Sequence, residues 1–196
     1  PVRLARIREQ RYPFLRTALP FVRHLAVQLD ETVHLSEFAG GRLFTVHVED
    51  STKAHRVFVA VGTLLPFHAS ASGLAFIAAC PDADVEAAAA QSLEAFTPFT
   101  VTDAAIFRSR VDETRADGFS ISRQGMEAGV ISASAAIGAP GARPIGCITV
   151  AAPLVRTDAA WIRQSGQAVA AAAGQISTAF FGADRDRRPA PHSRRR

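Results

Sequence analysis

The chain has 196 residues, 48% of them hydrophobic and 20% charged, with a formal net charge of +4. This is the size and composition of one domain with a well-buried core, or of one domain plus an extension. No apolar run approaches the roughly 20 residues of a membrane span, and residues 1–14 have no apolar core of the signal-peptide type. Because two cysteines without metal-type spacing indicate reduced thiols, we expect a cytoplasmic protein without a membrane partner.

The basic charge is concentrated at the two ends. Residues 1–16 and 184–196 together carry eleven arginines against three acidic residues, so that the ends contribute +8 and the body −4. The high isoelectric point would suggest nucleic acid as a partner, but the acidic body has no basic stripe on any predicted element. We expect residues 183–196 to form a disordered basic tail, either simply solvated or contacting phosphates without sequence preference.

Residues 3–29 are predicted to form a helix that acts as a linker, with Pro13 and Pro20 each breaking or restarting it. Its later part has the i, i+3 spacing of a buried face at Leu19, Val22 and Leu25. The sequence leaves open whether this face covers a sheet of the same chain or a partner.

Two strands are predicted next, Thr32–Phe38 and Arg42–Glu49, in a hairpin that turns at Gly40 and Gly41. Arg56–Val61, with the sequence RVFVAV, is predicted as a third short strand.

A run of five small residues, Ala69–Gly73, leads directly into an apolar helix over Leu74–Ala79. The first amides of a helix have no intrahelical partner, and together with the helix dipole they favour a carboxylate or phosphate. The run is therefore a candidate floor for a small-molecule pocket. The alternative is a helix packed closely on a sheet, with Ser70 or Ser72 as its N-cap. His68 is expected to be structural, although it could hydrogen-bond an anion.

Two helices are predicted in the middle of the chain. The first covers Asp82–Phe96, and the second is capped by Thr102 or Asp103 and ends at Gly118. The apolar face of the second helix comprises Ile106, Phe107, Val111 and Thr114.

Three further strands are predicted over Phe119–Arg123, Val130–Ile137 and Ile145–Ala152. Side chains alternate between faces along a strand, so one face is apolar and the other carries small polar groups. The apolar set is Phe119, Ile121, Ile131, Ala133, Ile148 and Val150, and the small polar set is Ser120, Ser122, Ser132, Ser134, Cys147, Thr149 and Ala151. A covered face of small hydroxyls suits a cavity for a polar ligand. The alternative is a wet sheet face.

A last helix is predicted over Asp158–Phe181. Runs of strands separated by runs of helices indicate an α+β fold with an antiparallel sheet.

These stretches, in this order, resemble the effector-binding domain of IclR-family transcriptional regulators. The resemblance covers roughly residues 14–182. The matching stretches are Asp30–Leu35, Gly62–Ala79 (GTLLPFHASASGLAFIAA), Phe96–Thr102, Arg115–Phe119, Gly129–Ala136 and Ile145–Pro153.

The resemblance implies a GAF-like fold, with a six-stranded antiparallel sheet flanked by helices. It also implies a small organic acid as effector, often glyoxylate, pyruvate or an aromatic acid, and a homodimer or homotetramer. DNA is bound by a separate winged helix-turn-helix. The effector positions fall on Ala71, Ser72, Ser122, Ser132, Thr149 and Ala151.

The chain also departs from the family pattern. It is expected to contain a linker helix region (residues 1–29), an effector-binding domain (30–182) and the tail (183–196), with no winged helix-turn-helix. Leu74 stands where Lys is frequent, Ser122 and Gly125 where acidic residues are common, and Ala151 where a hydroxyl can occur. These changes make the pocket less polar, and Phe67 is expected to line it. They favour a larger or more apolar acid over glyoxylate.

Two other functions remain open. Cys147 lies on the predicted pocket face, as an effector contact or as the redox cysteine of a GAF-like enzyme, which would need a lowered thiol pKa and a base such as His68 within reach. The domain could instead serve only for dimerisation. The preferred interpretation is a binding domain that is not an enzyme, with no catalytic residues, metal or cofactor.

Overall fold

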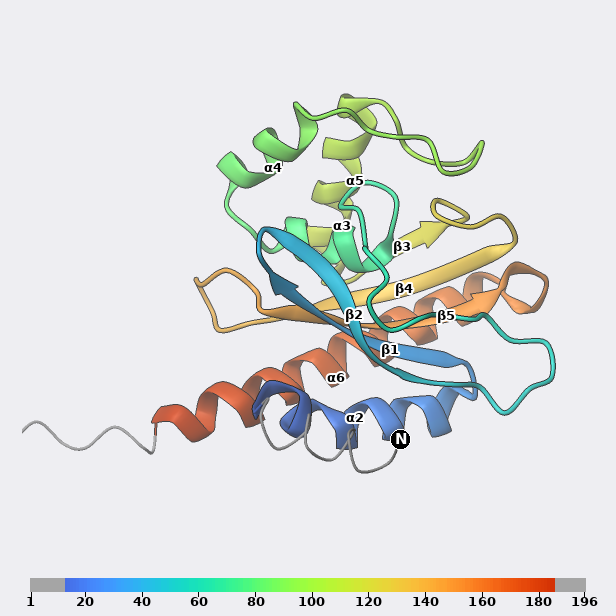
Figure 1. The fold of residues 1–196 in the computed structure, drawn as a ribbon, viewed down its shortest axis with the longest axis vertical. Helices are drawn as coiled ribbons and strands as arrows, with labels where there is room; N and C mark the ends of the chain where they lie inside the picture. The colour runs from blue at the N-terminus through green and yellow to red at the C-terminus, as the bar shows by residue number, and fades with distance from the viewer. Residues whose placement is uncertain (1–12, 186–196) are drawn as a thin grey trace, which may run out of the picture.

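The computed structural model describes residues 13–185 (Figure 1), so the expectations for residues 1–12 and 186–196 lie outside the described part. The helices are α2 (Pro13–Leu29), α3 (Ala71–Ala78), α4 (Asp82–Ala89), α5 (Ala104–Asp117), the 3-10 turn η1 (Leu154–Arg156) and α6 (Ala159–Arg185). The strands are β1 (Thr32–Ala39), β2 (Arg42–Glu49), β3 (Ser120–Arg123), β4 (Val130–Ile137) and β5 (Gly146–Pro153). Helix α6 extends three residues into the range expected as a tail.

The strands form one sheet in the order β2-β1-β5-β4-β3, and every neighbouring pair is antiparallel. Helices α2 and α6 cover one face of the sheet, while α3, α4 and α5 lie on the other (Figure 1). The predicted α+β class with an antiparallel sheet is confirmed. No described helix combines the length and hydrophobicity needed to cross a membrane.

The strand predicted over Arg56–Val61 is absent, and the sheet of the described residues has five strands rather than the six of the implied GAF-like arrangement. In this segment a side chain takes the place of a strand partner, because the Thr32 hydroxyl donates a hydrogen bond to the Val57 carbonyl at 2.7 Å. The chain rejoins the edge of β2 only later, through an isolated bridge between Phe44 and Leu64.

The predicted hairpin turn and the predicted caps of α5 are confirmed. Gly40 and Gly41 have φ angles of 58° and 78°, the left-handed conformation that a two-residue hairpin turn requires. Asp103 caps α5 by accepting hydrogen bonds from two amides of its first turn, and Gly118 ends the helix with φ 76°.

Pro20 does not break α2, contrary to the prediction. Both Pro20 and Arg16, whose carbonyl would have paired with residue 20, are exposed. Water can satisfy that carbonyl, and the buried face of the helix keeps its packing. The helix predicted over Asp82–Phe96 is shorter than expected, because α4 ends at Ala89.

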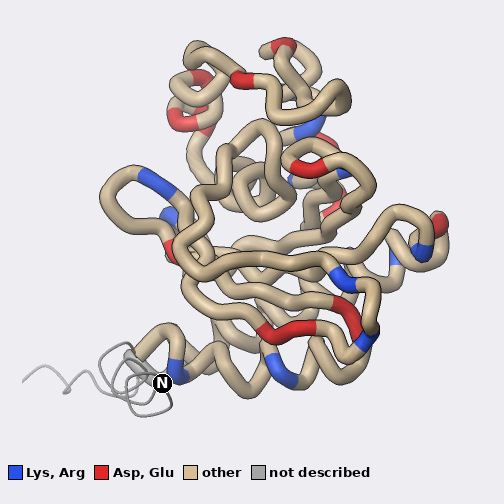
Figure 2. Tube along the Cα trace, turned by 45° about the vertical axis from the view of Figure 1, so that its right-hand side comes forward, with Lys and Arg blue, Asp and Glu red and all other residues tan. Residues whose placement is uncertain are grey.

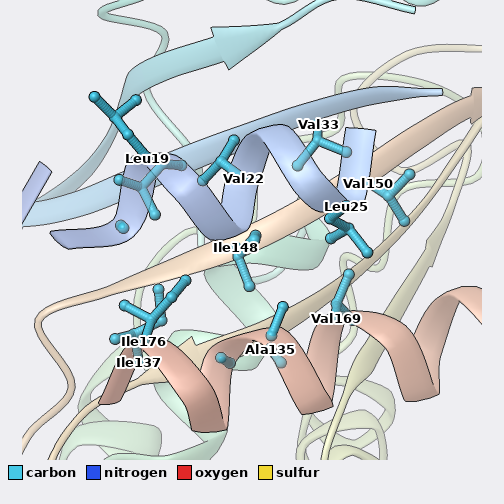
Figure 3. Close-up of a cluster of buried hydrophobic side chains, with 14 of the residues drawn as sticks. Leu19, Val22, Leu25, Val33, Ala135, Ile137, Ile148, Val150, Val169 and Ile176 are labelled. Carbon is cyan, nitrogen blue, oxygen red and sulfur yellow. The ribbon is translucent and has the colours of Figure 1, made fainter. Parts of the chain in front are cut away.

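The main core lies between the sheet and helices α2 and α6 (Figure 3). Leu19, Val22 and Leu25 of α2 pack into this cluster, which answers the question of what their apolar face covers. Its other members include Val33, Ala135, Ile137, Ile148, Val150, Val169 and Ile176. A second cluster joins α3, α4 and α5 on the other face of the sheet, around Phe76, Phe107 and Val111.

Charged residues in the described part are intermixed rather than gathered into a basic stripe (Figure 2). Many are paired, as in Arg143 with Asp84 and Arg108 with Glu86, both at 2.7 Å.

Candidate functional site

A cavity of about 340 Å³ lies between the start of α3, the segment 57–65, and the strands of the sheet. Six of the eight predicted effector residues line it: Ala71, Ser72, Ser122, Ser132, Thr149 and Ala151. The residues selected by strand alternation and those selected from the small-residue run therefore line the same cavity. The remaining wall is mainly apolar, with Val57, Leu65, Met126 and Val130 among its residues.

Phe67 and Cys147, the other two predicted residues, do not line this cavity. The Phe67 ring stacks on Phe76 with centroids 5.7 Å apart. Cys147 has an exposed fraction of 0%, and its thiol donates to the Ser72 carbonyl at 3.2 Å. Cys147 does lie on the predicted face of the sheet, but α3 covers that part of the face.

Part of the small polar face fastens α3 to the sheet. The Ser120 hydroxyl donates to the Ala71 carbonyl at 2.6 Å, and the Ser122 hydroxyl donates to the Ala69 carbonyl at 2.8 Å. These bonds satisfy hydroxyls that would otherwise be costly to bury. The face is therefore covered rather than wet, with some of its groups in contact with α3 and others lining the cavity.

The small-residue run at the start of α3 has an equally mixed role. Ser70 is the N-cap, and its hydroxyl accepts a hydrogen bond from the Gly73 amide at 2.9 Å. The backbone of Pro66 and Phe67 passes so close to Gly73 that a Cβ would not fit. Ala71 and Ser72, by contrast, are first-turn residues at the cavity wall, where amides have no i−4 acceptor and the helix dipole is positive.

His34 of β1 is a cavity residue that the sequence analysis missed. Its exposed fraction is 5%, and its Nε2 lies 3.2 Å from the Ser72 hydroxyl. Its Nδ1 is buried without a hydrogen-bond partner among the described residues. Burial lowers the pKa of His34 to about 4, so the ring is neutral at pH 7. Alternation along the predicted first strand would have found it, because His34 pairs directly with Thr149 of β5.

Ser72 connects His34 to the sheet through a series of hydroxyls. The Ser72 hydroxyl lies 2.7 Å from that of Thr149, which lies 2.8 Å from that of Ser134. Ser134 in turn donates to the Ile148 carbonyl at 3.1 Å. All of these groups are buried, so the network is a fixed part of the cavity wall.

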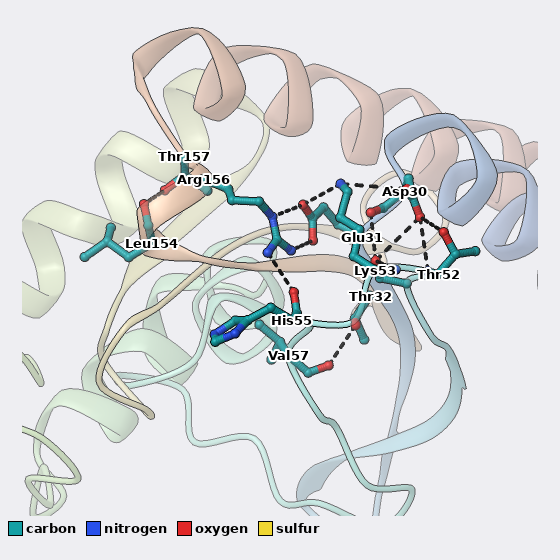
Figure 4. Close-up of polar contacts among 11 residues, drawn as sticks. Asp30, Glu31, Thr32, Thr52, Lys53, His55, Val57, Leu154, Arg156 and Thr157 are labelled. Atoms are coloured by element: carbon teal, nitrogen blue, oxygen red, sulfur yellow. Dashed lines mark hydrogen bonds and ion pairs between the residues drawn. The ribbon is translucent and has the colours of Figure 1, made fainter.

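The wall formed by residues 57–60 is held by an ion-pair cluster at its base (Figure 4). Glu31 is 2% exposed and pairs with both Arg156 (2.8 Å) and Lys53 (2.9 Å). Arg156 also donates to the His55 carbonyl at 2.6 Å. These partners lie far apart in the sequence, and no local pattern in the sequence indicates their pairing.

The charges around the cavity are sparse. Glu127 is the one acidic residue among its lining residues, and none of the described lining residues is Lys or Arg. His68, considered above as an anion contact, instead hydrogen-bonds the Glu94 carbonyl at 2.9 Å and does not line this cavity. An anion in this cavity would therefore meet amides and hydroxyls rather than a cationic side chain. The described residues contain no group of three or more His, Cys, Asp or Glu side chains placed to hold a metal ion.

Comparison with known proteins identifies the family. Residues 9–178 match the family model described as "Bacterial transcriptional regulator IclR C-terminal". The chain is 27% identical to the HTH-type transcriptional repressor AllR of Klebsiella pneumoniae over 82% of this chain and 60% of that protein. It is 32% identical to the HTH-type transcriptional regulator Rv1719 of Mycobacterium tuberculosis over 60% of this chain and 46% of that protein. The chain thus spans at most about three fifths of these two relatives.

Solved structures of IclR proteins share the fold of this chain. A putative IclR transcriptional regulator from Silicibacter sp. TM1040 is 34% identical, with a TM-score of 0.82 over 91% of this chain and 71% of that one. An IclR homolog from Microbacterium hydrocarbonoxydans, complexed with 4-hydroxybenzoate, shares the fold with a TM-score of 0.75 at 22% identity, over 87% of this chain and 69% of that one. This chain therefore belongs to the IclR family of bacterial transcriptional regulators, and residues 9–178 correspond to the family's C-terminal domain.

Proposed function

We propose that this domain binds a small organic or aromatic carboxylic acid in the cavity at the start of α3, as the effector-binding part of a cytoplasmic transcriptional regulator. Binding would modulate DNA recognition by a separate winged helix-turn-helix, in a homodimer or homotetramer. One observation carries the proposal: a cavity of about 340 Å³ brings the free amide end of α3 opposite a hydroxyl-bearing sheet face. A carboxylate fits the amide end.

The size and lining of the cavity favour an acid larger than glyoxylate. Its volume lies at the lower end of the range of small-molecule sites, about 300 to 1,000 Å³. Val57, Met126, Val130 and Ala151 supply apolar surface for a ring or an alkyl group. The Microbacterium homolog complexed with 4-hydroxybenzoate supports an aromatic acid as the first candidate.

Effector binding can regulate only if it favours one arrangement of the protein over another. Strand β1 offers a physical connection, because His34 lines the cavity while Val33 and Leu35 pack in the core that α2 enters. Helix α2 directly precedes β1. A shift of β1 on binding would therefore reach α2, the element nearest to any domain that precedes it.

The redox-enzyme alternative is disfavoured by the surroundings of Cys147. Burial raises the pKa of its thiol, so that the nucleophilic thiolate is suppressed at neutral pH. The similar proteins named above are transcriptional regulators. The remaining alternative is a dimerisation module without a ligand. The following experiment distinguishes it from an effector-binding domain.

The experiment is a thermal-shift screen with glyoxylate, pyruvate, benzoate and 4-hydroxybenzoate. A ligand at about 100 times its Kd stabilises the native state by roughly 2.7 kcal/mol, which shifts the Tm by several degrees. We expect the shift to disappear in Ser132→Leu, which fills the cavity, and to persist in Thr178→Leu, an exposed change on α6. No shift with any acid would contradict the proposal and favour the dimerisation module.

A further inference from the structure

The hydroxyl network beside the cavity has one direction of hydrogen bonding. The Ile148 carbonyl can only accept, so Ser134 donates its single hydroxyl hydrogen there. Ser134 must then accept from Thr149, and Thr149 must accept from Ser72. With its own hydrogen used, Ser72 accepts from His34, whose Nε2 therefore carries the hydrogen.

The other end of the network agrees with this direction. The Nδ1 of His34 is buried and has no partner among the described residues. A hydrogen on Nδ1 would be a buried donor without an acceptor, which is rarer in proteins than an under-used acceptor. The low pKa of His34, caused by burial, keeps the second hydrogen off the ring at pH 7. Both ends thus favour the neutral Nε2–H tautomer.

This direction decides what the cavity wall can offer a ligand. Ser72 and Thr149 line the cavity, but each has given its hydrogen to another side chain and retains only lone pairs. Ser122 has likewise donated to a backbone carbonyl. The Ser132 hydroxyl, by contrast, has no partner among the described residues and keeps its hydrogen for a ligand, and the first-turn amides of α3 are donors on the same wall.

We propose that the wall formed by Ser72 and Thr149 recognises a hydrogen-bond donor on the effector, and that Ser134, outside the cavity, sets this preference as a positioning residue. The effector would be a carboxylic acid that also carries a hydroxyl or amide N–H group. This inference rests on the proposed function, because it specifies the class of acid that the same cavity takes. An acid without such a donor would leave the second lone pair of Ser72 and of Thr149 unused, or would direct its own lone pairs at them, which we expect to cost about tenfold in Kd.

Ser134→Ala tests the assignment from outside the cavity. The variant removes the acceptor of Thr149, whose hydroxyl hydrogen becomes free to point at the ligand. Ser120→Ala is the matched control: Ser120 faces Ser134 across β3 and β4 and is equally buried. Its hydroxyl contacts only backbone carbonyls, those of Ala71 (2.6 Å) and Ser134 (3.4 Å), so it lies outside the chain of hydroxyls. Neither residue lines the cavity.

Calorimetric titration would compare benzoate with its 3- and 4-hydroxy derivatives, and acetate with glycolate. We expect the wild type and Ser120→Ala to prefer a hydroxylated acid about tenfold, and this ratio to fall toward one in Ser134→Ala. A wild type that binds acids without this preference, or a Ser134→Ala variant that retains it, would overturn the inference and leave the proposed function standing. If no acid bound at all, both would be wrong.

The tautomer of His34 gives a readout that needs neither a ligand nor a variant. Long-range proton–nitrogen correlation spectra of the 15N-labelled wild-type protein distinguish a hydrogen on Nε2 from one on Nδ1. We expect the Nε2–H form at pH 7. An Nδ1–H form would reverse the direction of the network and overturn the inference, even if Ser134→Ala failed to fold.

Discussion

The two faces of the sheet bury side chains by different means. Toward α2 and α6, β4 and β5 present Ala, Ile and Val, which pack without any polar partner to satisfy. Toward α3 the same strands present Ser134, Cys147 and Thr149, equally buried and each hydrogen-bonded. Apolar packing is non-directional and tolerant of small shifts, whereas hydrogen bonds fix distances and angles.

One sheet can therefore stabilise the domain through one face and shape a cavity with the other. The apolar face contributes to the larger of the two buried hydrophobic clusters. The polar face fixes where α3 begins, and it leaves the cavity beside that point. Changes on the first face should therefore alter the stability of the domain, and changes on the second should alter what it binds.

The largest expected effect is on the apolar face. Ile148→Ala removes a fully buried side chain between α2 and α6, and we expect a loss of about 4 kcal/mol in the free energy of unfolding. Urea denaturation measures it. Ile148→Val, which removes one methylene, should cost only about 1 kcal/mol. Equal losses in both variants would mean that this face is not the tightly packed one.

The apolar face was also the part of the molecule that sequence reasoning predicted best. Alternation along the last three strands placed Ala133, Ile148 and Val150 on one side, and all three are in the core. Helical spacing similarly identified the buried residues of α2. Both patterns are local consequences of backbone geometry, so they can be read from a single sequence.

The polar face was predicted in position but not in detail. Alternation found its residues, yet Cys147 and Ser120 lie under α3, whereas Ser132 lies in the cavity. That distinction depends on where a helix from elsewhere in the chain rests. The wall at residues 57–60 was mistaken for a strand, because its β-branched sequence resembles one while its backbone is held by distant side chains, including Thr32.

The buried His34 side chain should make the stability of the domain depend on pH. Its pKa is about 4 in the folded protein against an ordinary value of 6.5. Between these values the unfolded chain binds more protons than the folded one, so the free energy of unfolding falls as the pH falls. We expect a loss of about 3 kcal/mol by pH 4.

Parallel urea titrations of the wild type and His34→Gln from pH 7 to pH 4 would isolate this contribution, because other titrating groups affect both proteins alike. Gln places an amide near the position of Nε2 and carries no titrating group. The wild-type curve should fall more steeply. Parallel curves would mean that His34 titrates normally and is not desolvated in the folded state.

The ion-pair cluster should link stability to the shape of the cavity. Arg156→Gln leaves Glu31 buried with only Lys53 as a charged partner. We expect a loss of about 2 kcal/mol, below the usual cost of breaking a buried pair because Lys53 remains. Hydrogen exchange should rise in residues 53–60, which lose the bond from Arg156 to His55. Arg110→Gln, in an exposed pair with Glu113, is the control and should change stability by less than about 0.5 kcal/mol.

The smallest effect on stability is expected where the polar face opens into the cavity. Ser132 has a free hydroxyl among the described residues, so Ser132→Ala should change the free energy of unfolding by less than about 0.5 kcal/mol. It removes a donor to the effector, which we expect to weaken every acid by about three- to tenfold. Hydroxylated and unsubstituted acids should weaken alike, unlike in Ser134→Ala, where the ratio changes. Calorimetry on the two variants would therefore separate a residue that contacts the ligand from one that only orients the contacting groups. An unchanged affinity in Ser132→Ala would show that the α3 amides alone hold the carboxylate.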